Sequence, residues 1–320
     1  MALQFIFGPS GAGKSHYIYS KIIQESMEHP GRSYLVLVPE QFTMQTQKAL
    51  VEMHPRKGIM NIDVLSFERL AFRVLEEVGE TQRELLEETG KSMVLRRVAQ
   101  EKKKELKVLG SKMDKQGYVS QMKSMVSELR QYEIGSSDLE EILEDLKNRP
   151  ELYYKLKDMQ VLYQGFFEYL EGNFITQEEV LDVLGRVADK SRKLKDSVLV
   201  LDGYTGFTPI QIQLLEKLLE ISSQIYVTVT MGRGEDPYHP GSPHQLFCLS
   251  KQTVARLCKL ASEKKIHWEE QWVPEKGAPY QGRFTKNLPM DFLERNLFRY
   301  RRGTYDKKQH AVHILSLIHI

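Results

Sequence analysis

Eight residues near the start of the chain have the types and spacing of a phosphate-binding loop. They read Gly-Pro-Ser-Gly-Ala-Gly-Lys-Ser and match the pattern Gly-x-x-x-x-Gly-Lys-Ser without a mismatch. In such a loop the glycines let successive backbone N–H groups point into one concavity that holds phosphate oxygens. Lys14 would reach the β- and γ-phosphates, and the Ser15 hydroxyl would ligate Mg²⁺. The pattern predicts an ATP and Mg²⁺ site formed by this phosphate loop: Gly8, Pro9, Ser10, Gly11, Ala12, Gly13, Lys14 and Ser15.

The residues on either side of the phosphate loop supply the elements that position it. Residues 3–7 form a short apolar run that suits a buried strand, and residues 14–27 have the pattern of a helix. A loop between a strand and a helix N-terminus directs backbone N–H groups at phosphate. The alternative is a glycine-rich turn that only joins a strand to a helix. The presence of all three elements favours the nucleotide site.

A second residue of the same site is expected at the end of another strand. Asp202 directly follows the apolar run 197–201, and a P-loop protein needs a strand-ending acid to hold Mg²⁺ through its waters. Asp202 is therefore predicted to share the metal with Ser15, the alternative being a turn residue at a strand end. In superfamily 1 helicases this acid opens a D-E-x-Q-D-type motif, whose glutamate activates the attacking water. The residue at that place here is Gly203. Loss of a general base lowers a rate by about 10²–10⁴, so the sequence predicts ATP binding with weak or no hydrolysis and no catalytic residue.

Apolar, β-rich runs alternate with helical patterns in two separate parts of the chain. Runs at 34–38 and 62–65 follow the first helix, and runs at 197–201 and 225–230 come after a long stretch without a strand pattern. Continuous apolar strands separated by helices are typical of a parallel sheet. The predicted fold is an α/β P-loop NTPase, with a parallel sheet like that of superfamily 1 helicases and a large all-helical insertion.

The same patterns predict five parts along the chain. They are the first part of the α/β domain (1–80), the helical insertion (81–195), the resumed α/β domain (196–275), a basic and aromatic connector to a missing C-terminal part (276–314) and a non-native tail (315–320). The insertion is expected to hold helices at 84–105, 115–132, 138–147, 151–172 and 176–190 and to contain no strand. A helix start is expected at Ser137 and Asp138, and a strand-like run begins at 311–314. The tail resembles translated sequencing-adapter DNA, the alternative being a natural short C-terminus.

Composition excludes several classes of protein. The formal net charge of +2 gives no global basic field for nucleic acid. Two cysteines, Cys248 and Cys258, exclude a disulfide framework and indicate a reducing cytoplasm. No apolar run approaches membrane-spanning length, so no membrane partner is expected. The spacing of these cysteines with His239 and His244 does not match zinc sites, and packed cysteines on one helix are favoured over a metal centre.

Five stretches of the chain form a recognisable series: residues 5–15, 37–43, 64–70, 202–209 and 293–298. The most specific parts are Val-Pro-Glu-Gln-Phe-Thr and Asp-Gly-Tyr-Thr-Gly-Phe-Thr-Pro. In this order the stretches resemble the AddB family of subunits from bacterial AddAB-type helicase–nucleases, and the resemblance covers residues 1–314.

The resemblance implies a helicase-like half that does not translocate, paired with an AddA-type helicase subunit in a heterodimer. The complex would resect double-strand breaks for recombinational repair, and this half would bind the passing DNA single strand. The family also carries a nuclease domain with a four-cysteine iron–sulfur cluster. With two cysteines and no nuclease carboxylate motif here, cluster and nuclease are expected outside this chain, which should bind nucleotide and cut nothing alone. The alternatives are a P-loop phosphotransferase, and a nucleotide-dependent scaffold without catalysis.

Two regions are candidates for contact with DNA. Helicase-like domains touch DNA through the loops after the second and third strands, and the residues at these places are Gln41, Phe42, Thr43, Ser66 and Phe67. The alternative is that both phenylalanines are packing residues at helix starts. Residues 283–310 carry eight Lys or Arg against three acids, interleaved with aromatics. This composition suits a single-strand path, and equally a solvated linker or a subunit interface.

Overall fold

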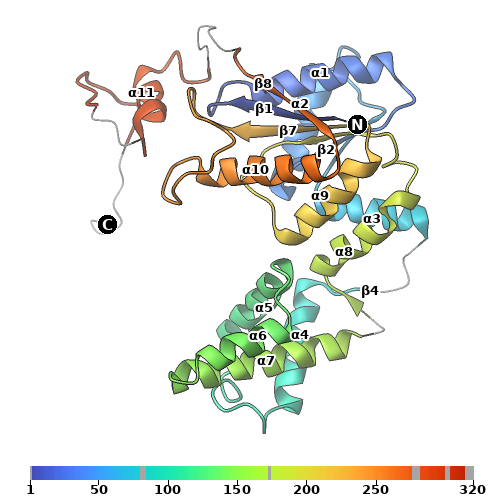
Figure 1. Cartoon of the computed structure of the whole chain (residues 1–320), viewed down its shortest axis with the longest axis vertical. Helices are drawn as coiled ribbons and strands as arrows, with labels where there is room; N and C mark the ends of the chain where they lie inside the picture. The colour runs from blue at the N-terminus through green and yellow to red at the C-terminus, as the bar shows by residue number, and fades with distance from the viewer. Residues whose placement is uncertain (1, 80–83, 172–173, 276–281, 300–302, 314–320) are drawn as a thin grey trace. The chain divides into compact units, whose positions relative to one another are not determined.

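The computed structural model describes residues 2–79, 84–171, 174–275, 282–299 and 303–313. The chain divides into two compact units (Figure 1). The first unit contains Met1–Phe67, Arg192–Phe207 and Leu218–Ile320, and the second contains Glu68–Ser191 and Thr208–Lys217. The predicted non-native tail, and residues 276–281, 300–302 and 314 of the predicted connector, lie outside the described residues.

A six-stranded sheet in the order β3-β2-β6-β7-β1-β8 forms the centre of the first unit. Every pairing in this sheet is parallel, which confirms the predicted α/β class with a parallel sheet. Strand β1 lies between β7 and β8, and β6 lies between β2 and β7. The bounds are β1 Ala2–Gly8, β2 Tyr34–Leu37, β3 Ile62–Leu65, β6 Val198–Leu201, β7 Gln224–Thr230 and β8 His267–Trp272.

Helix α1 (Lys14–Glu28) is fixed on the sheet by one apolar face. Its buried residues include Ile18, Ile22 and Ile23, which recur at the spacing of one helical face. They share a hydrophobic core with Val36 of β2 and Val200 of β6. This packing holds the first turn of α1 at the end of β1. The other helices that lie wholly in this unit are η1 Glu40–Phe42, α2 Thr43–Met53, α10 Cys248–Glu263 and α11 Leu288–Asn296.

The sequence did not indicate β8 or α11, and one expected strand is wrong. Strand β8 reads His-Trp-Glu-Glu-Gln-Trp and lies at the sheet edge, so it lacks the apolar run of a central strand. Helix α11 is short, although the Asn287 side chain caps it by accepting a hydrogen bond from Met290 N at 3.4 Å. Residues 311–313 are irregular. There the backbone N–H groups of Ala311 and Val312 donate to Oε1 of Gln309 instead of to a neighbouring strand.

The second unit is mainly helical. Helices α4 and α7 approach closely where Gly165 faces Val98, since a Cβ at Gly165 would lie 2.6 Å from Cγ1 of Val98. The core around them includes Leu95, Leu162 and Phe166. Helix α9 (Pro209–Ile221) begins in this unit and ends in the first. The remaining bounds are α3 Phe67–Val78, α4 Glu88–Glu101, α5 Gln116–Gln131, α6 Ser136–Asp145, α7 Pro150–Leu170, α8 Gln177–Val187 and η2 Ala188–Lys190.

Two details of this region differ from the sequence prediction. Strands β4 (Glu84–Leu85) and β5 (Phe174–Ile175) pair in parallel, although residues 81–195 were expected to contain no strand. Strands of two residues are too short to show the alternation of apolar and polar residues that indicates a strand. The helix expected from residue 84 begins at Glu88. Helix α6 begins one residue before Ser137, because Oδ2 of Asp138 accepts a hydrogen bond from Gly135 N at 2.7 Å and so caps the turn there.

One buried carboxylate organises the turns between α4 and α5. Asp158 of α7 is 1% exposed and accepts three backbone N–H groups. The donors, at 2.9, 2.6 and 2.8 Å, are Lys107, Val108 and Leu109. A carboxylate that accepts several backbone N–H groups satisfies donors that would otherwise be buried without a partner. Asp158 therefore holds this irregular segment against α7.

Among the described residues, every helix is too short or too polar to cross a lipid bilayer.

Candidate nucleotide-binding site

The phosphate loop connects β1 to α1 through two glycines in left-handed conformations. Gly11 has φ 74° and Gly13 has φ 94°. A side chain at such φ values is strained, so the glycines of the pattern are required by the backbone. Gly13 is the N-cap of α1 and has no side chain that could cap the first turn. The N–H groups of a helix start are natural donors to an anion at the loop.

Gly8 is required for a different reason, which is a close approach of backbone. A Cβ at Gly8 would lie 2.2 Å from the carbonyl oxygen of Val273, which follows β8. Val273 N donates to Phe7 O at 2.8 Å, and Met231 N, just after β7, donates to Gly8 O at 3.0 Å. The start of the phosphate loop is thus bonded to the chain on both sides of β1.

The ammonium group of Lys14 lies across the phosphate loop. Its Nζ donates to Gly8 O at 3.0 Å and to Pro9 O at 3.1 Å. Burial lowers the pKa of Lys14 to about 8, while the negative charges of Asp202 and Glu294 act in the opposite direction. A partly desolvated cation held by two backbone carbonyl oxygens at the loop is a strong partner for phosphate.

Ser15 and Asp202 meet at the start of α1, although they lie 187 positions apart in the chain. The Ser15 hydroxyl donates to Oδ1 of Asp202 at 3.1 Å. Asp202 is 6% exposed, and its backbone N donates to Leu37 O at 3.0 Å, which fixes the residue at the end of β6. The structure therefore brings together the two residues that the sequence assigned to Mg²⁺.

Two further hydroxyls bind the Asp202 carboxylate. The Tyr19 hydroxyl donates to Oδ2 at 2.6 Å, and the Thr228 hydroxyl donates to Oδ1. Burial, together with the negative charge of Asp202, raises the pKa of Tyr19 above its ordinary value, so the phenol stays a donor. The sequence did not indicate either residue as part of the site. Tyr19 lies one helical turn after Ser15, and Thr228 lies one place beyond the Leu201–Val227 pair, so both follow from helix and sheet geometry once Asp202 is placed.

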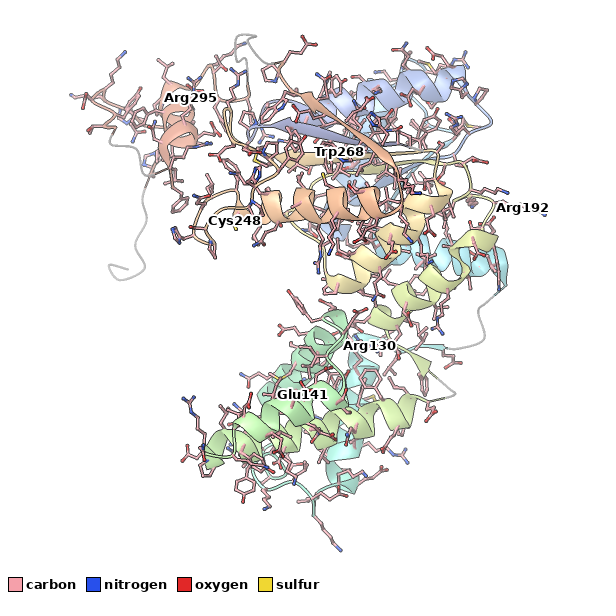
Figure 2. The ribbon with its side chains drawn as sticks, viewed as in Figure 1. Arg130, Glu141, Arg192, Cys248, Trp268 and Arg295 are labelled. Carbon is pink, nitrogen blue, oxygen red and sulfur yellow. The ribbon has the colours of Figure 1, made fainter. Side chains whose placement is uncertain are left out.

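The oxygen atoms at this place fit Mg²⁺. A serine hydroxyl and a carboxylate are hard ligands, and Mg²⁺ uses few protein ligands because it keeps waters and binds substrate phosphates. Elsewhere in the described ranges, no group of three or more His, Cys, Asp or Glu residues could hold a metal. Cys248 (Figure 2) and Cys258 lie on α10, as the sequence predicts, and both are free thiols. Burial raises the pKa of Cys258 to about 11.

Position 203 offers only backbone to the site. Gly203 has φ 81°, and a Cβ built on it would lie 3.6 Å from Cδ of Pro39. The following Tyr204 turns into an aromatic cluster, with ring centroids 5.4 Å from Phe67 and 5.1 Å from Phe207. The chain after β6 is therefore devoted to a tight turn and to packing.

Comparison with known proteins identifies the family. The family model described as "ADDB, N-terminal" matches residues 5–294. The chain belongs to the AddB family. A relative from Lachnoclostridium phytofermentans, named as the B-type subunit of an ATP-dependent helicase/deoxyribonuclease, is 44% identical over 317 residues, which cover 99% of this chain and 28% of the relative. Relatives of the same name from Caldanaerobacter subterraneus and Thermoanaerobacter pseudethanolicus are 33% and 31% identical, over 99% and 100% of this chain and 27% of each relative.

The chain thus spans 27–28% of the length of each of these three AddB relatives. The matched range contains the phosphate loop, Asp202 and most of α11, so the resemblance predicted from the sequence stretches is confirmed.

The candidate DNA residues of this AddB-family chain fall into two groups. Gln41 is exposed and Phe42 is 44% exposed, at the turn after β2. Thr43, Ser66 and Phe67 are buried, with Phe67 only 4% exposed. The Thr43 hydroxyl donates to Glu40 O at 2.9 Å, and Phe67 packs in the aromatic cluster. Only Gln41 and Phe42 present a large side-chain surface to a ligand, and their contact with DNA stays a prediction.

The described part of the basic connector packs beside the phosphate loop. Arg283 N donates to Gly11 O at 2.9 Å, and Arg283 Cβ would lie 3.0 Å from a Cβ at Gly11. Arg299 pairs with Glu294 at 3.2 Å and lies over the Phe247 ring at 5.0 Å from its centroid. These contacts order the connector around the site.

Proposed function

We propose that this chain binds ATP with Mg²⁺ at the phosphate loop and acts as the nucleotide-binding part of an AddAB-type helicase–nuclease subunit. The observation that carries the proposal is the 3.1 Å contact between Ser15 and Asp202. Backbone N–H groups of the loop and Lys14 would bind the phosphates. Ser15 would ligate Mg²⁺, and Asp202 would hold its waters. The order of strands and the ATP-dependent names of the relatives support a P-loop NTPase assignment.

The same proposal includes weak or absent hydrolysis. A glycine at position 203 has no carboxylate to deprotonate water, and its left-handed turn keeps the backbone near Pro39. General acid–base catalysis contributes about 10²–10⁴ to a rate. Bound ATP would therefore be converted to ADP more slowly than in an active helicase.

The wider role follows from the family. The relatives are named as helicase/deoxyribonuclease subunits, and we place this chain in a cytoplasmic heterodimer with an AddA-type helicase subunit that resects double-strand breaks for recombinational repair. The partner supplies translocation, and this chain contacts single-stranded DNA through exposed groups such as Gln41 and Phe42. The relatives are named as deoxyribonuclease subunits, and we place the nuclease, with the iron–sulfur cluster that the resemblance implies, in the part of their length that this chain does not match.

Equilibrium binding of fluorescent ATP with Mg²⁺ to the 320-residue chain tests the nucleotide site. Lys14→Ala should weaken binding by about tenfold or more, because it removes the cation that lies across the loop. Lys48→Ala is the matched control, since the Lys48 side chain is 77% exposed and pairs with Glu52 one helical turn away. Equal affinity of wild type and Lys14→Ala would refute the site. Steady-state ATP turnover with single-stranded DNA, at a rate typical of a helicase, would refute the Gly203 argument.

A further inference from the structure

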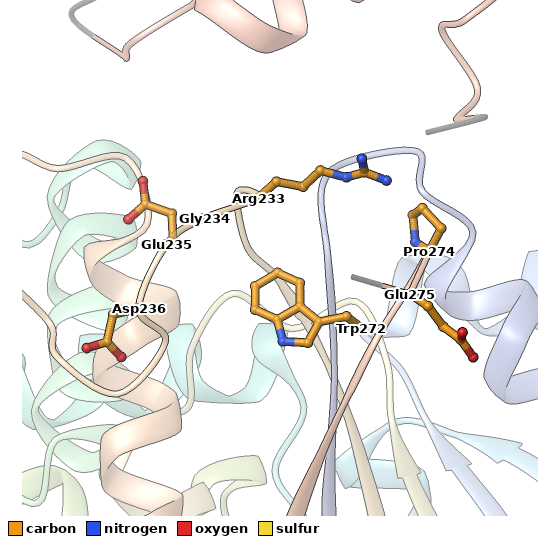
Figure 3. A pocket seen from close by; sticks show the side chains of 7 residues that line it. All are labelled: Arg233, Gly234, Glu235, Asp236, Trp272, Pro274 and Glu275. Atoms are coloured by element: carbon orange, nitrogen blue, oxygen red, sulfur yellow. The ribbon is translucent and has the colours of Figure 1, made fainter. Parts of the chain in front are cut away.

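A pocket of about 450 Å³ lies at the carboxyl end of the sheet, next to the phosphate loop. It is formed by the chain just after β7 and by the end of β8 (Figure 3). Its volume falls in the range of small-molecule sites, and ligands of open α/β sheets bind at this edge. The lining residues are Arg233, Gly234, Glu235, Asp236, Trp272, Pro274 and Glu275.

Both walls of the pocket are bonded to the start of the phosphate loop. Val273 lies between Trp272 and Pro274, donates to Phe7 O at 2.8 Å and places its own carbonyl against Gly8. Met231, two residues before Arg233, donates to Gly8 O at 3.0 Å. The pocket is therefore attached through its walls to the loop that would hold the phosphates of a nucleotide.

The lining has flat apolar surfaces and charged groups. The Trp272 ring is held against Phe7, with centroids 5.2 Å apart, and its Nε1 donates to Glu270 at 3.3 Å. The Arg233 side chain extends above the Trp272 ring toward Pro274 (Figure 3). Trp272 is 8% exposed, so only part of its indole reaches the pocket. That part, the proline ring and the guanidinium group suit a nucleobase, because all three pack against planar rings.

The carboxylates of the lining are placed differently. Asp236 accepts a hydrogen bond from Tyr238 N at 3.0 Å and contacts His239, so local bonds occupy it. Glu275 is exposed at the end of the lining. A carboxylate at this place can accept hydrogen bonds from ribose hydroxyls, as acidic residues do in other nucleotide sites.

We propose that this pocket holds the base and ribose of the nucleotide whose phosphates bind at residues 8–15. The inference rests on the proposed function, because it takes the phosphate loop as the place of the triphosphate. Trp272 and Pro274 contact the base, and Glu275 binds the ribose. Trp272 thereby favours ligands that carry a base over inorganic polyphosphate, whereas the phosphate loop does not distinguish between them.

Competition binding with ATP and with inorganic tripolyphosphate separates the pocket from the phosphate loop. Trp272→Leu should weaken ATP binding about tenfold, the usual effect of removing one base-stacking ring. Glu275→Ala should weaken it several-fold. Tripolyphosphate affinity should change less than twofold in both. Glu269→Ala is the matched control, because this glutamate of β8 is exposed and outside the lining. Unchanged ATP affinity in both pocket variants would overturn the proposal. It would also be overturned if the folded variants lost as much affinity for tripolyphosphate as for ATP.

A fluorescence measurement gives a readout that does not require a pocket mutation. The chain has two tryptophans, Trp268 and Trp272, so Trp268→Phe leaves Trp272 as the single reporter. ATP should quench or shift its emission, and saturating tripolyphosphate should not. Trp272→Phe, which leaves Trp268 four residues earlier in β8 (Figure 2), should respond to neither. Binding of tripolyphosphate and ATP with equal affinity and no Trp272 response would refute the pocket alone. Binding of neither ligand would refute the phosphate site.

Discussion

The phenolic oxygen of Tyr19 lies 2.6 Å from Oδ2 of Asp202, so a tyrosine of α1 supports the acid that we assign to Mg²⁺. Both groups are buried. With Ser15 and Thr228 on the other carboxylate oxygen, Asp202 is held in place before any metal binds. This arrangement links the stability of the first unit to its proposed ligand site.

Replacing Tyr19 by phenylalanine should lower the free energy of unfolding by about 1.5–3 kcal/mol, the usual contribution of a hydrogen bond to a charged group. Urea unfolding followed by tryptophan fluorescence measures this in the first unit, because Trp268 and Trp272 both lie there. Tyr132→Phe is the control, since Tyr132 is 60% exposed. Equal stability of the two variants would show that the Tyr19–Asp202 bond contributes nothing.

Binding of ATP should weaken as the pH rises through about 8. Burial lowers the pKa of Lys14 to about 8, so the free protein loses this positive charge above that value. Phosphate favours the charged form, and binding above pH 8 then requires uptake of a proton, which reduces affinity by up to about tenfold per pH unit. Titrations at pH 7, 8 and 9 with wild type and Lys14→Arg measure the effect. The arginine variant should show a flat profile, and an equal slope in both proteins would contradict the assignment.

The lowered pKa of Lys14 gives stability the opposite pH dependence, because its contribution to the free energy of unfolding improves as the pH rises. A lysine whose folded pKa lies below its unfolded value destabilises the folded state at low pH, and this cost disappears as the pH rises from 8 toward the unfolded value. Lys14→Met should therefore unfold at a higher urea concentration than wild type at pH 7 while losing nucleotide binding. The difference should shrink at pH 10. A less stable Lys14→Met protein at pH 7 would contradict this sign.

Restoring a side chain at position 203 should destabilise the protein. Gly203 has φ 81°, and a non-glycine residue in this region costs about 1–2 kcal/mol. Gly203→Ala and Gly203→Glu should lose similar stability in urea unfolding, because the strain lies in the backbone. Gly185→Ala on α8 is the control, since a Cβ there meets no atom within 4 Å and φ is not left-handed. A neutral Gly203→Ala variant would show that this turn relaxes freely.

Loss of the Asp158 carboxylate should loosen one segment of the helical unit. Asp158→Ala leaves three backbone N–H groups without their acceptor, and the expected loss is about 2–5 kcal/mol. Hydrogen exchange read at the amides of Lys107, Val108 and Leu109 measures it locally. Glu141→Ala, at an exposed position of α6, is the control. Unchanged protection of these amides would show that other contacts hold the segment.

The sequence predicted the parts of the fold that depend on repeated local patterns. The apolar runs of β2, β6 and β7 indicated the parallel sheet, and the spacing of the phosphate loop indicated Lys14 and Ser15. Asp202 could be predicted because a P-loop site needs an acid at the end of a neighbouring strand, and Asp202 directly follows the apolar run 197–201. Strand β8 was not predicted because an edge strand needs only one apolar face, and its polar residues carry no run.

Other features depend on contacts between distant residues. Asp158 looks like any surface acid of a helix until the turn that it binds is folded against it. Thr228 joins the site only through the register of β7 with β6. The pocket beside Gly8 arises from two loops whose residues have no common motif. Sequence patterns predict elements, whereas pockets depend on how the ends of elements meet.

The hydrogen bond from Arg283 N to Gly11 O connects the phosphate loop to the segment before α11. Gly11 has a left-handed φ of 74°, and its carbonyl oxygen is the acceptor of this hydrogen bond. A change in the backbone at Gly11 would therefore move the acceptor. A triphosphate that reorients the loop must therefore either preserve the bond or displace residues 282–287. We therefore expect nucleotide bound at the loop to act on the chain that leads into α11 through this one hydrogen bond, without any hydrolysis.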